Sequence, residues 1–307
     1  MIKTERQSER EFNLLSPEKR SILENGVNTV ILDLESSLTG NEAMNFWAAM
    51  IGAEKEVRGI TNKAMNNKNG KNEREYERSL IARLAINQPT EYMVGAADQR
   101  NIELISSNAV EVVNALMDSG INVLVVTGGM DKVTKSIAGY FHCPFYTNKL
   151  YKNSRTGRYT EIGDQDVLVR TNGKRELVKE LREKGIIEGP IGVFGDGTND
   201  MGVDADIKIC MTCWNERDEA IPESDIAVDA IEAILPIFEG RNRRKIMRSG
   251  YYQYLLRLGV FQLKRPATQF NDLALGIELL ADLSEEYNPK RDNDRVIYQF
   301  RSNGYEK

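Results

Sequence analysis

Segment 27–38, with the sequence VNTVILDLESSL, decides the fold of this 307-residue chain. Residues 27–32 are apolar nearly throughout and rich in β-branched side chains, which is typical of a strand buried on both faces of a parallel sheet. Asp33 follows where this strand is expected to end. The segment therefore predicts an early strand of an α/β domain with a carboxylate at its carboxyl end.

The same pattern continues along the chain. A periodic segment, 109–117, precedes an apolar run at 121–126, and a helical segment, 174–184, precedes a run at 191–194. A further strand is expected at 207–211. Strands that alternate with helices predict a Rossmann-like α/β core with a mostly parallel, doubly wound sheet. Residues 145–170 are expected to form β structure around a turn at 152–157.

The segment after the first strand is helical in pattern and divides the chain. It predicts a small helical cap, interrupted by an Asn- and Gly-rich break at 66–70. The predicted organisation is a helical extension at 1–26, a core at 27–40 and 96–239, the cap at 41–95, and a C-terminal helical extension at 240–307.

Composition narrows the class of protein. Apolar residues make up 41% and charged residues 28%, as in ordinary globular chains, and the net charge of -5 argues against a nucleic-acid partner. Residues 1–6 lack the apolar core of a secretory signal, and no run is long enough to span a membrane. Cys143, Cys210 and Cys213 are too few for a disulfide framework, so we expect a cytoplasmic protein.

Three of the predicted strands end in polar or glycine-rich segments. These are 33–37, 127–129 and 195–200, and adjacent strands would bring them into one crevice at the carboxyl edge of the sheet. Four acids meet there, namely Asp33, Glu35, Asp196 and Asp200. Clustered carboxylates suit a hard cation, so we expect a Mg²⁺ site. The alternatives for the single segments are helix caps, turns or a calcium loop.

The same crevice carries groups that bind phosphate. Gly128 and Gly129 let backbone N–H groups approach an anion, and the hydroxyls of Thr127 and Ser37 are candidate donors. Lys174 is expected either to neutralise a phosphate or to hold the nucleophile in place. An aspartate is a known covalent catalyst of phosphoryl transfer.

With these motifs the sequence resembles the haloacid-dehalogenase phosphatases, and phosphoserine phosphatases in particular, over about residues 27–234. The resemblance implies that Asp33 is the nucleophile and that Glu35 is the general acid/base, whose backbone carbonyl also binds Mg²⁺. Thr127-Gly128-Gly129 matches the second motif and Asn172-Gly173-Lys174 the third.

The fourth motif matches residues 195–200. By resemblance, Asp196 is a metal ligand, Asn199 lies near the phosphate, and Asp200 supports the metal and the lysine.

The cap carries the substrate-specific part of the resemblance. Asn41-Glu42 matches a pair whose Glu binds the substrate ammonium group, and Tyr76-Glu77-Arg78-Ser79-Leu80 leads to Arg83, which would bind the carboxylate. These residues imply O-phospho-L-serine as the substrate, hydrolysed through an aspartyl-phosphate. The alternative for both charges is a solvated helix face.

Two features keep rival functions open. Glu35 stands where most members have Asp, and the region 240–307 lies outside the resemblance. The rivals are a phosphatase or phosphotransferase for another small ester, and a catalytically weak binding protein. In this region a segment with helical spacing at 251–261 is followed by a second expected helix at 270–283, which should end at Asn288-Pro289. We expect these C-terminal helices to pack on the core or to form a homodimer contact. A role for their basic cluster (241–248) in RNA or partner binding is disfavoured by the negative charge of the chain.

Overall fold

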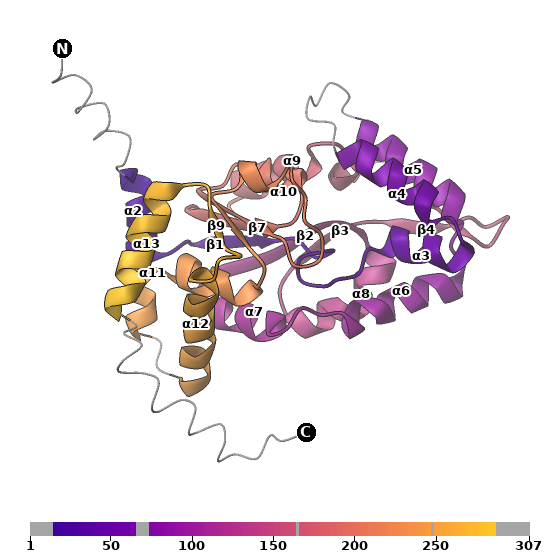
Figure 1. Cartoon of the computed structure of the whole chain (residues 1–307). Coiled ribbons are helices and arrows are strands. Elements are labelled where there is room, and N and C mark those ends of the chain that lie inside the picture. The colour runs from indigo at the N-terminus through magenta and orange to yellow at the C-terminus, as the bar shows by residue number, and fades with distance from the viewer. Residues whose placement is uncertain (1–14, 66–73, 164–165, 247–248, 287–307) are drawn as a thin grey trace, which may run out of the picture.

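The computed structural model describes residues 15–65, 74–163, 166–246 and 249–286 (Figure 1). The break expected at 66–70 and the end of the last helix expected at Asn288-Pro289 lie outside the described residues. The longer elements are α2 (Pro17–Asn25), β1 (Thr29–Leu32), α3 (Ala43–Ile51), α4 (Glu54–Met65), α5 (Glu75–Asn87), α6 (Glu91–Glu103), α7 (Ala109–Asp118), β2 (Asn122–Met130), α8 (Asp131–Phe141), β3 (Phe145–Asn148), β4 (Leu150–Lys152), β5 (Tyr159–Ile162), α9 (Gly173–Glu183), β6 (Ile191–Gly195), α10 (Thr198–Met201), β7 (Ile207–Met211), β8 (Ile226–Val228), α11 (Ile234–Ile246), α12 (Gly250–Leu263), β9 (Gln269–Phe270) and α13 (Leu273–Glu286).

A seven-stranded sheet forms the centre of the core, in the order β3-β2-β1-β6-β7-β8-β9. β1 lies between β2 and β6 and pairs with both in parallel, so that Val30 lies opposite Val123 on one side and Gly192 on the other. Only the β8–β9 pair within this sheet is antiparallel. The predicted α/β core with a mostly parallel sheet is confirmed, as is the adjacency of the three strands that end in polar segments.

Both faces of the sheet are covered, which explains why β1 is apolar throughout. Val30 and Leu32 pack into one core cluster, to which α2, α7, α8, α11, α12 and α13 contribute. Ile31 points to the other face, where α9 and α10 pack. Alternate residues of one strand therefore serve two hydrophobic cores.

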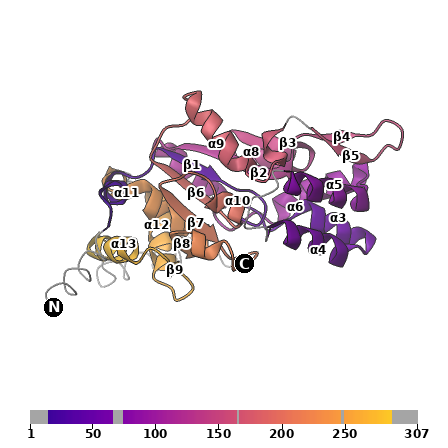
Figure 2. The same cartoon turned by 90° about the horizontal axis from the view of Figure 1, so that it is seen from above.

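The cap lies at one end of the core, opposite α2, α11 and α13, as both views show (Figures 1 and 2). Helices α3–α6 and the β4–β5 hairpin share a hydrophobic cluster around Trp47, whose Nε1 donates to the Met93 carbonyl at 2.8 Å. The cap boundary predicted between residues 95 and 96 falls inside α6. Val94 and Ala97 are both buried on this helix, so its buried stripe continues past residue 95.

The C-terminal segment packs on the core rather than standing apart. Leu255 of α12 and Leu279 of α13 are fully buried in the main cluster. Arg244 belongs to the basic cluster noted in the sequence, yet its side chain is buried and pairs with Asp282 at 2.7 Å and Glu286 at 2.9 Å. This arginine therefore fixes α13 to α11. A homodimer contact through this region stays a prediction.

Two boundaries differ from those expected. The sequence predicts a helix from residue 270, but Phe270 belongs to β9. α13 begins later because the Asp272 carboxylate caps it by accepting from the Leu275 N–H at 3.0 Å. Residues 127–129 were placed after a strand but lie inside β2, because Met130 pairs again with Asn148 of β3. None of the described helices has the length and apolar character needed to cross a membrane.

Candidate active site

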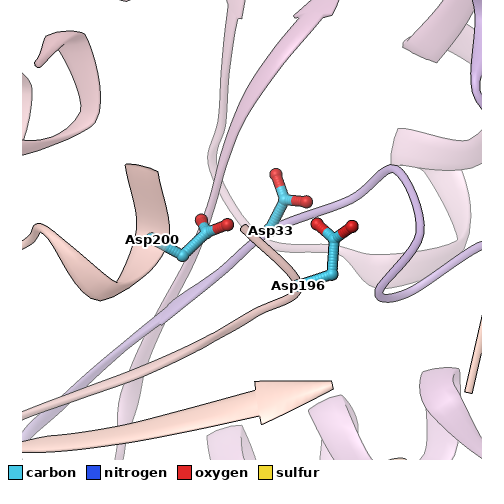
Figure 3. Close-up of side chains that lie close together, drawn as sticks. All are labelled: Asp33, Asp196 and Asp200. Atoms are coloured by element: carbon cyan, nitrogen blue, oxygen red, sulfur yellow. The ribbon is translucent and has the colours of Figure 1, made fainter. Parts of the chain in front are cut away.

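Three aspartates meet at the carboxyl ends of β1 and β6 (Figure 3). Asp33 follows β1, and its N–H donates to the Phe194 carbonyl of β6 at 2.8 Å. Asp196 and Asp200 follow β6 across a glycine-rich turn, and a carboxylate oxygen from each of the three lies within 4.8 Å of the others. All three side chains are buried. This set of hard oxygen donors fits Mg²⁺, so the residues present match the predicted cation.

Lys174 supplies the positive charge beside these acids. Its Nζ lies 2.5 Å from Asp33 Oδ1 and 2.5 Å from Asp200 Oδ1. Burial alone would lower the pKa of this lysine, but the carboxylates of Asp200 and Asp33 outweigh burial and raise the pKa above its ordinary value. Lys174 is therefore a permanent cation at the start of α9.

Burial changes the protonation of the two aspartates that follow β6. Burial raises the pKa of Asp200 to about 6, although Lys174 works to lower it. Burial also raises the pKa of Asp196 well above its usual range, which Arg217 partly opposes. Such acids are held at an energetic cost that a divalent cation would relieve.

Glu35 lies at the mouth of the cap. Its Oε1 accepts from the Ala43 N–H at 2.9 Å, at the start of α3. Burial raises the pKa of Glu35 to about 7, and the nearby carboxylates of Glu42 and Asp33 add to the rise. A carboxyl group with this pKa can both give and take a proton near neutral pH. Its side chain lies apart from the cluster of three aspartates, and a metal contact of its backbone carbonyl stays a prediction.

The glycine-rich segment of β2 forms one wall of the site. A Cβ at Gly128 would lie 2.5 Å from the Tyr76 hydroxyl, so a larger residue there would require the Tyr76 side chain to move. The Gly129 N–H donates to Thr127 Oγ1 at 3.0 Å. That hydrogen bond leaves the Thr127 hydroxyl hydrogen available for an anion, while the Gly129 N–H is already used within the chain.

The site encloses a small cavity of about 80 Å³. Ten of the predicted residues line it: Asp33, Glu35, Glu42, Arg83, Thr127, Gly128, Lys174, Asp196, Asn199 and Asp200. Ser37 and Gly129 are not among the lining residues. Ser37 instead donates to Asp33 Oδ2 at 3.4 Å, so it contacts the candidate nucleophile.

Arg83 reaches the cavity from α5 of the cap. Its side chain is 5% exposed, and its Nη1 donates to Thr61 Oγ1 at 3.3 Å. Among the residues that the structure describes, nothing accepts a hydrogen bond from its Nη2. A buried guanidinium with an unused donor is suited to an anionic group of a ligand.

Several lining residues were not expected from the sequence. They are Arg217 from the segment after β7, Arg170 before α9, and Thr61 and Met44 of the cap. Tyr76 was visible in the sequence only as part of the match to a family motif. Arg217 lies in an irregular segment with no periodicity. The sequence marks residues 213–217 only as a departure from the family pattern that alters the rim of the site, and it assigns Arg217 no role.

The cysteines stay outside this chemistry. Burial raises the pKa of the Cys210 thiol to about 12 and that of Cys143 to about 11, and it also raises the pKa of Cys213. Thiols of this kind are poor nucleophiles at neutral pH.

Comparisons with known proteins agree with this geometry, although no family model matches the chain. It is 24% identical over 233 residues to the chloroplastic phosphoserine phosphatase of Arabidopsis thaliana, covering 73% of this chain and 76% of that protein. It is 29% identical over 181 residues to the phosphoserine phosphatase of Methanocaldococcus jannaschii, covering 57% and 79%. A solved structure described as a phospho-aspartyl intermediate analogue of phosphoserine phosphatase matches with a TM-score of 0.53 at 22% identity, covering 73% of this chain and 100% of that one.

The chain is thus similar in sequence to phosphoserine phosphatases, and it has the haloacid-dehalogenase fold. The similarity indicates a phosphoric monoester hydrolase.

Proposed function

We propose that this protein hydrolyses small phosphate monoesters, O-phosphoserine among them, in a Mg²⁺-dependent reaction that passes through a phosphorylated Asp33. The observation that carries the proposal is the position of Asp33. It is buried at the end of β1, in contact with Lys174 and within 4.8 Å of Asp196 and Asp200. The names of the curated relatives support the substrate.

In the first half-reaction, a carboxylate oxygen of Asp33 attacks phosphorus and the ester P–O bond breaks. The leaving alcohol oxygen takes the proton of Glu35, whose pKa of about 7 keeps a protonated fraction near neutral pH. Lys174 stays charged, so it holds Asp33 in place and reduces repulsion between the carboxylate and the phosphate dianion.

In the second half-reaction, Glu35 accepts a proton from water while the water oxygen attacks phosphorus. The bond between phosphorus and Asp33 breaks, which releases inorganic phosphate and restores the carboxylate. Asp33, Asp196 and Asp200 would hold the Mg²⁺ ion, which supplies positive charge next to the transferred group.

The cap side supports a substrate that carries a second anion. Arg83 offers its unused Nη2 to a carboxylate, as in phosphoserine. The rivals are hydrolysis of a different small ester, transfer to an alcohol acceptor, and phosphate binding without turnover.

A substrate panel tests the proposal. Mg²⁺-dependent phosphate release is measured with phosphoserine, phosphothreonine, phosphoethanolamine and sugar phosphates, and Asp33→Asn is the control. Turnover of phosphoserine that is lost in Asp33→Asn is expected. Turnover of other esters but not of phosphoserine would keep Asp33 as the nucleophile and reject phosphoserine as the substrate. Absence of turnover by folded, Mg²⁺-loaded protein would favour phosphate binding without catalysis.

A further inference from the structure

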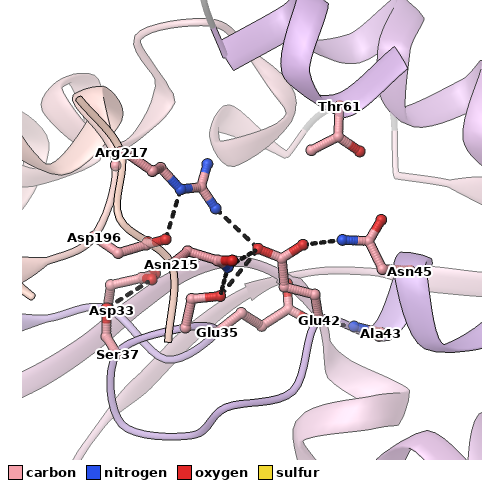
Figure 4. Close-up of polar contacts among 12 residues, drawn as sticks. Asp33, Glu35, Ser37, Glu42, Ala43, Asn45, Thr61, Asp196, Asn215 and Arg217 are labelled. Carbon is pink, nitrogen blue, oxygen red and sulfur yellow. Dashed lines mark hydrogen bonds and ion pairs between the residues drawn. The ribbon is translucent and has the colours of Figure 1, made fainter. Parts of the chain in front are cut away.

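The carboxylate of Glu42 already has four hydrogen-bond donors within the chain (Figure 4). Its Oε1 accepts from Ser36 Oγ, from Asn215 Nδ2 and from Arg217 Nη2, each at 2.9 Å. Its Oε2 accepts from Asn45 Nδ2. Each oxygen of a carboxylate offers about two acceptor positions, so Oε1 is fully used and Oε2 keeps about one. This is the residue that the sequence assigned to the ammonium group of a substrate.

Arg217 is the only charged group among those four donors. Besides its bond to Glu42, its Nε lies 2.7 Å from Asp196 Oδ2. A guanidinium keeps its charge in proteins, so Arg217 is a cation between two carboxylates. One arginine therefore connects the core, through Asp196, with the residue at the start of α3.

The segment that carries Arg217 is fixed to the core by Trp214. The indole Nε1 donates to Ser106 Oγ at 2.9 Å. The ring packs on Gly40 so closely that a Cβ there would lie 2.4 Å from it. The contacts of Trp214 therefore hold the segment with Arg217 at the cavity. Asn215 of the same segment adds a hydrogen bond from its Nδ2 to Ser36 Oγ at 2.7 Å.

We propose that Arg217 determines specificity, because it takes the place on Glu42 that a substrate ammonium group would occupy. The site therefore accepts phosphate esters of carboxylic acids whether or not they carry an amino group. An ammonium group at Glu42 would share this carboxylate with the guanidinium of Arg217, whose like charge repels it. The inference rests on the proposed function, since it names the substrate class of the same site.

The remaining charges of the cavity agree with an anionic leaving group. Arg83, Arg170, Lys174 and Arg217 all line it. Lys174 and Arg217 already pair with acids of the site and Arg170 pairs with Glu176 at 2.8 Å, so Arg83 is the cation of this set with an unused donor. The unused Nη2 of Arg83 provides for the carboxylate without help from Glu42.

Two substrates with the same skeleton test the inference. kcat/KM is measured for L-phosphoserine and for 3-(phosphonooxy)propanoate, which lacks only the amino group. A site built around an ammonium group rejects such an analogue by about 10⁴-fold, whereas we expect the wild-type ratio to stay within about tenfold. In Arg217→Gln, Glu42 loses its charged partner, and we expect the ratio to rise at least about tenfold in favour of phosphoserine.

Two further variants control for unrelated effects. Arg217→Lys keeps the charge and should retain the wild-type ratio. Arg58→Gln removes an exposed arginine that pairs with Glu54 at 2.6 Å, and it should leave the ratio unchanged. A wild-type preference for phosphoserine above about tenfold, or an unchanged ratio in Arg217→Gln, would overturn the inference.

Measurements of binding affinity test this inference independently of the proposed function. The affinities of the two esters are also measured by calorimetry in the Asp33→Asn background, with and without Arg217→Gln. The same shift in ratio is expected there, because both esters bind without reacting. Absence of turnover by the wild type would count against the proposed function, while the binding ratio would still decide the role of Arg217.

Discussion

Lys174 Nζ lies 2.5 Å from Oδ1 of Asp33, the first residue after β1. The two side chains are separated by 141 positions in the sequence, and they meet because α9, which begins next to Lys174, leads into β6, the parallel neighbour of β1. The same Nζ contacts Asp200, so one cation bridges two acids of the candidate metal cluster. The lysine therefore holds the candidate nucleophile in place before any phosphate arrives.

Replacing this lysine should disable the reaction. We expect Lys174→Met to lower kcat for phosphoserine by at least about 10²-fold, because Asp33 loses its positioning partner and the phosphate loses a cation. Lys179→Met on the same helix is the control, since Lys179 is exposed and pairs only weakly with Glu183 at 3.9 Å. Near-wild-type turnover by folded Lys174→Met would show that the contact is structural.

Replacing the ionisable carboxyl group of Glu35 by an amide, in Glu35→Gln, should slow the second half-reaction more than the first. p-Nitrophenolate is a good leaving group that needs no proton, so the first step of Glu35→Gln with p-nitrophenyl phosphate should stay fast. Activation of water should slow by about 10²–10⁴-fold. Stopped-flow absorbance should then show a burst of about one nitrophenolate per site, followed by slow turnover. Steady turnover at the wild-type rate without a burst would exclude Glu35 as the base.

The core was predictable because its signals are local and repeated. Apolar runs at β1, β2, β6 and β7, each followed by a turn or a polar segment, determine the parallel sheet. Most acids of the site were visible for the same reason, since they follow directly after strands. The edge strand β9 was missed because two residues are too few to show the alternating pattern of a strand. Only their pairing with β8 makes them one.

The rim of the site was not predictable from sequence. Arg217 reaches Glu42 across 175 positions from an irregular segment, so neither spacing nor periodicity connects the two. The resemblance assigned Glu42 to a substrate group. It did not show the three side chains that share its Oε1. Functional residues on loops depend on tertiary contacts of this kind.

Glu239 should make stability depend on pH. Its side chain is fully buried, and burial raises its pKa to about 7, although hydrogen bonds from Ser119 and Tyr252 oppose the rise. In the unfolded chain the group ionises near its ordinary pKa of 4.5. Between these two values the unfolded state loses the proton first, so the contribution of Glu239 to stability falls as pH rises, by about 3 kcal/mol in total.

Denaturation by urea at pH 5 and pH 8 measures this contribution. We expect Glu239→Gln to gain stability relative to wild type on going from pH 5 to pH 8, by about 1–3 kcal/mol. Glu183→Gln, at an exposed position of α9, should show no such gain. An equal difference between Glu239→Gln and wild type at both pH values would show that Glu239 is not protonated in the folded state.

Phosphorylation of Asp33 is the most direct test of the proposed chemistry. Mg²⁺-loaded protein is quenched with acid during turnover of phosphoserine, and its peptides are analysed by mass spectrometry. We expect the peptide that contains Asp33 to carry one phosphoryl group, and we expect both the label and the turnover to be absent from Asp33→Asn. Phosphate release with no label on that peptide, and with turnover retained in Asp33→Asn, would contradict a covalent role for Asp33.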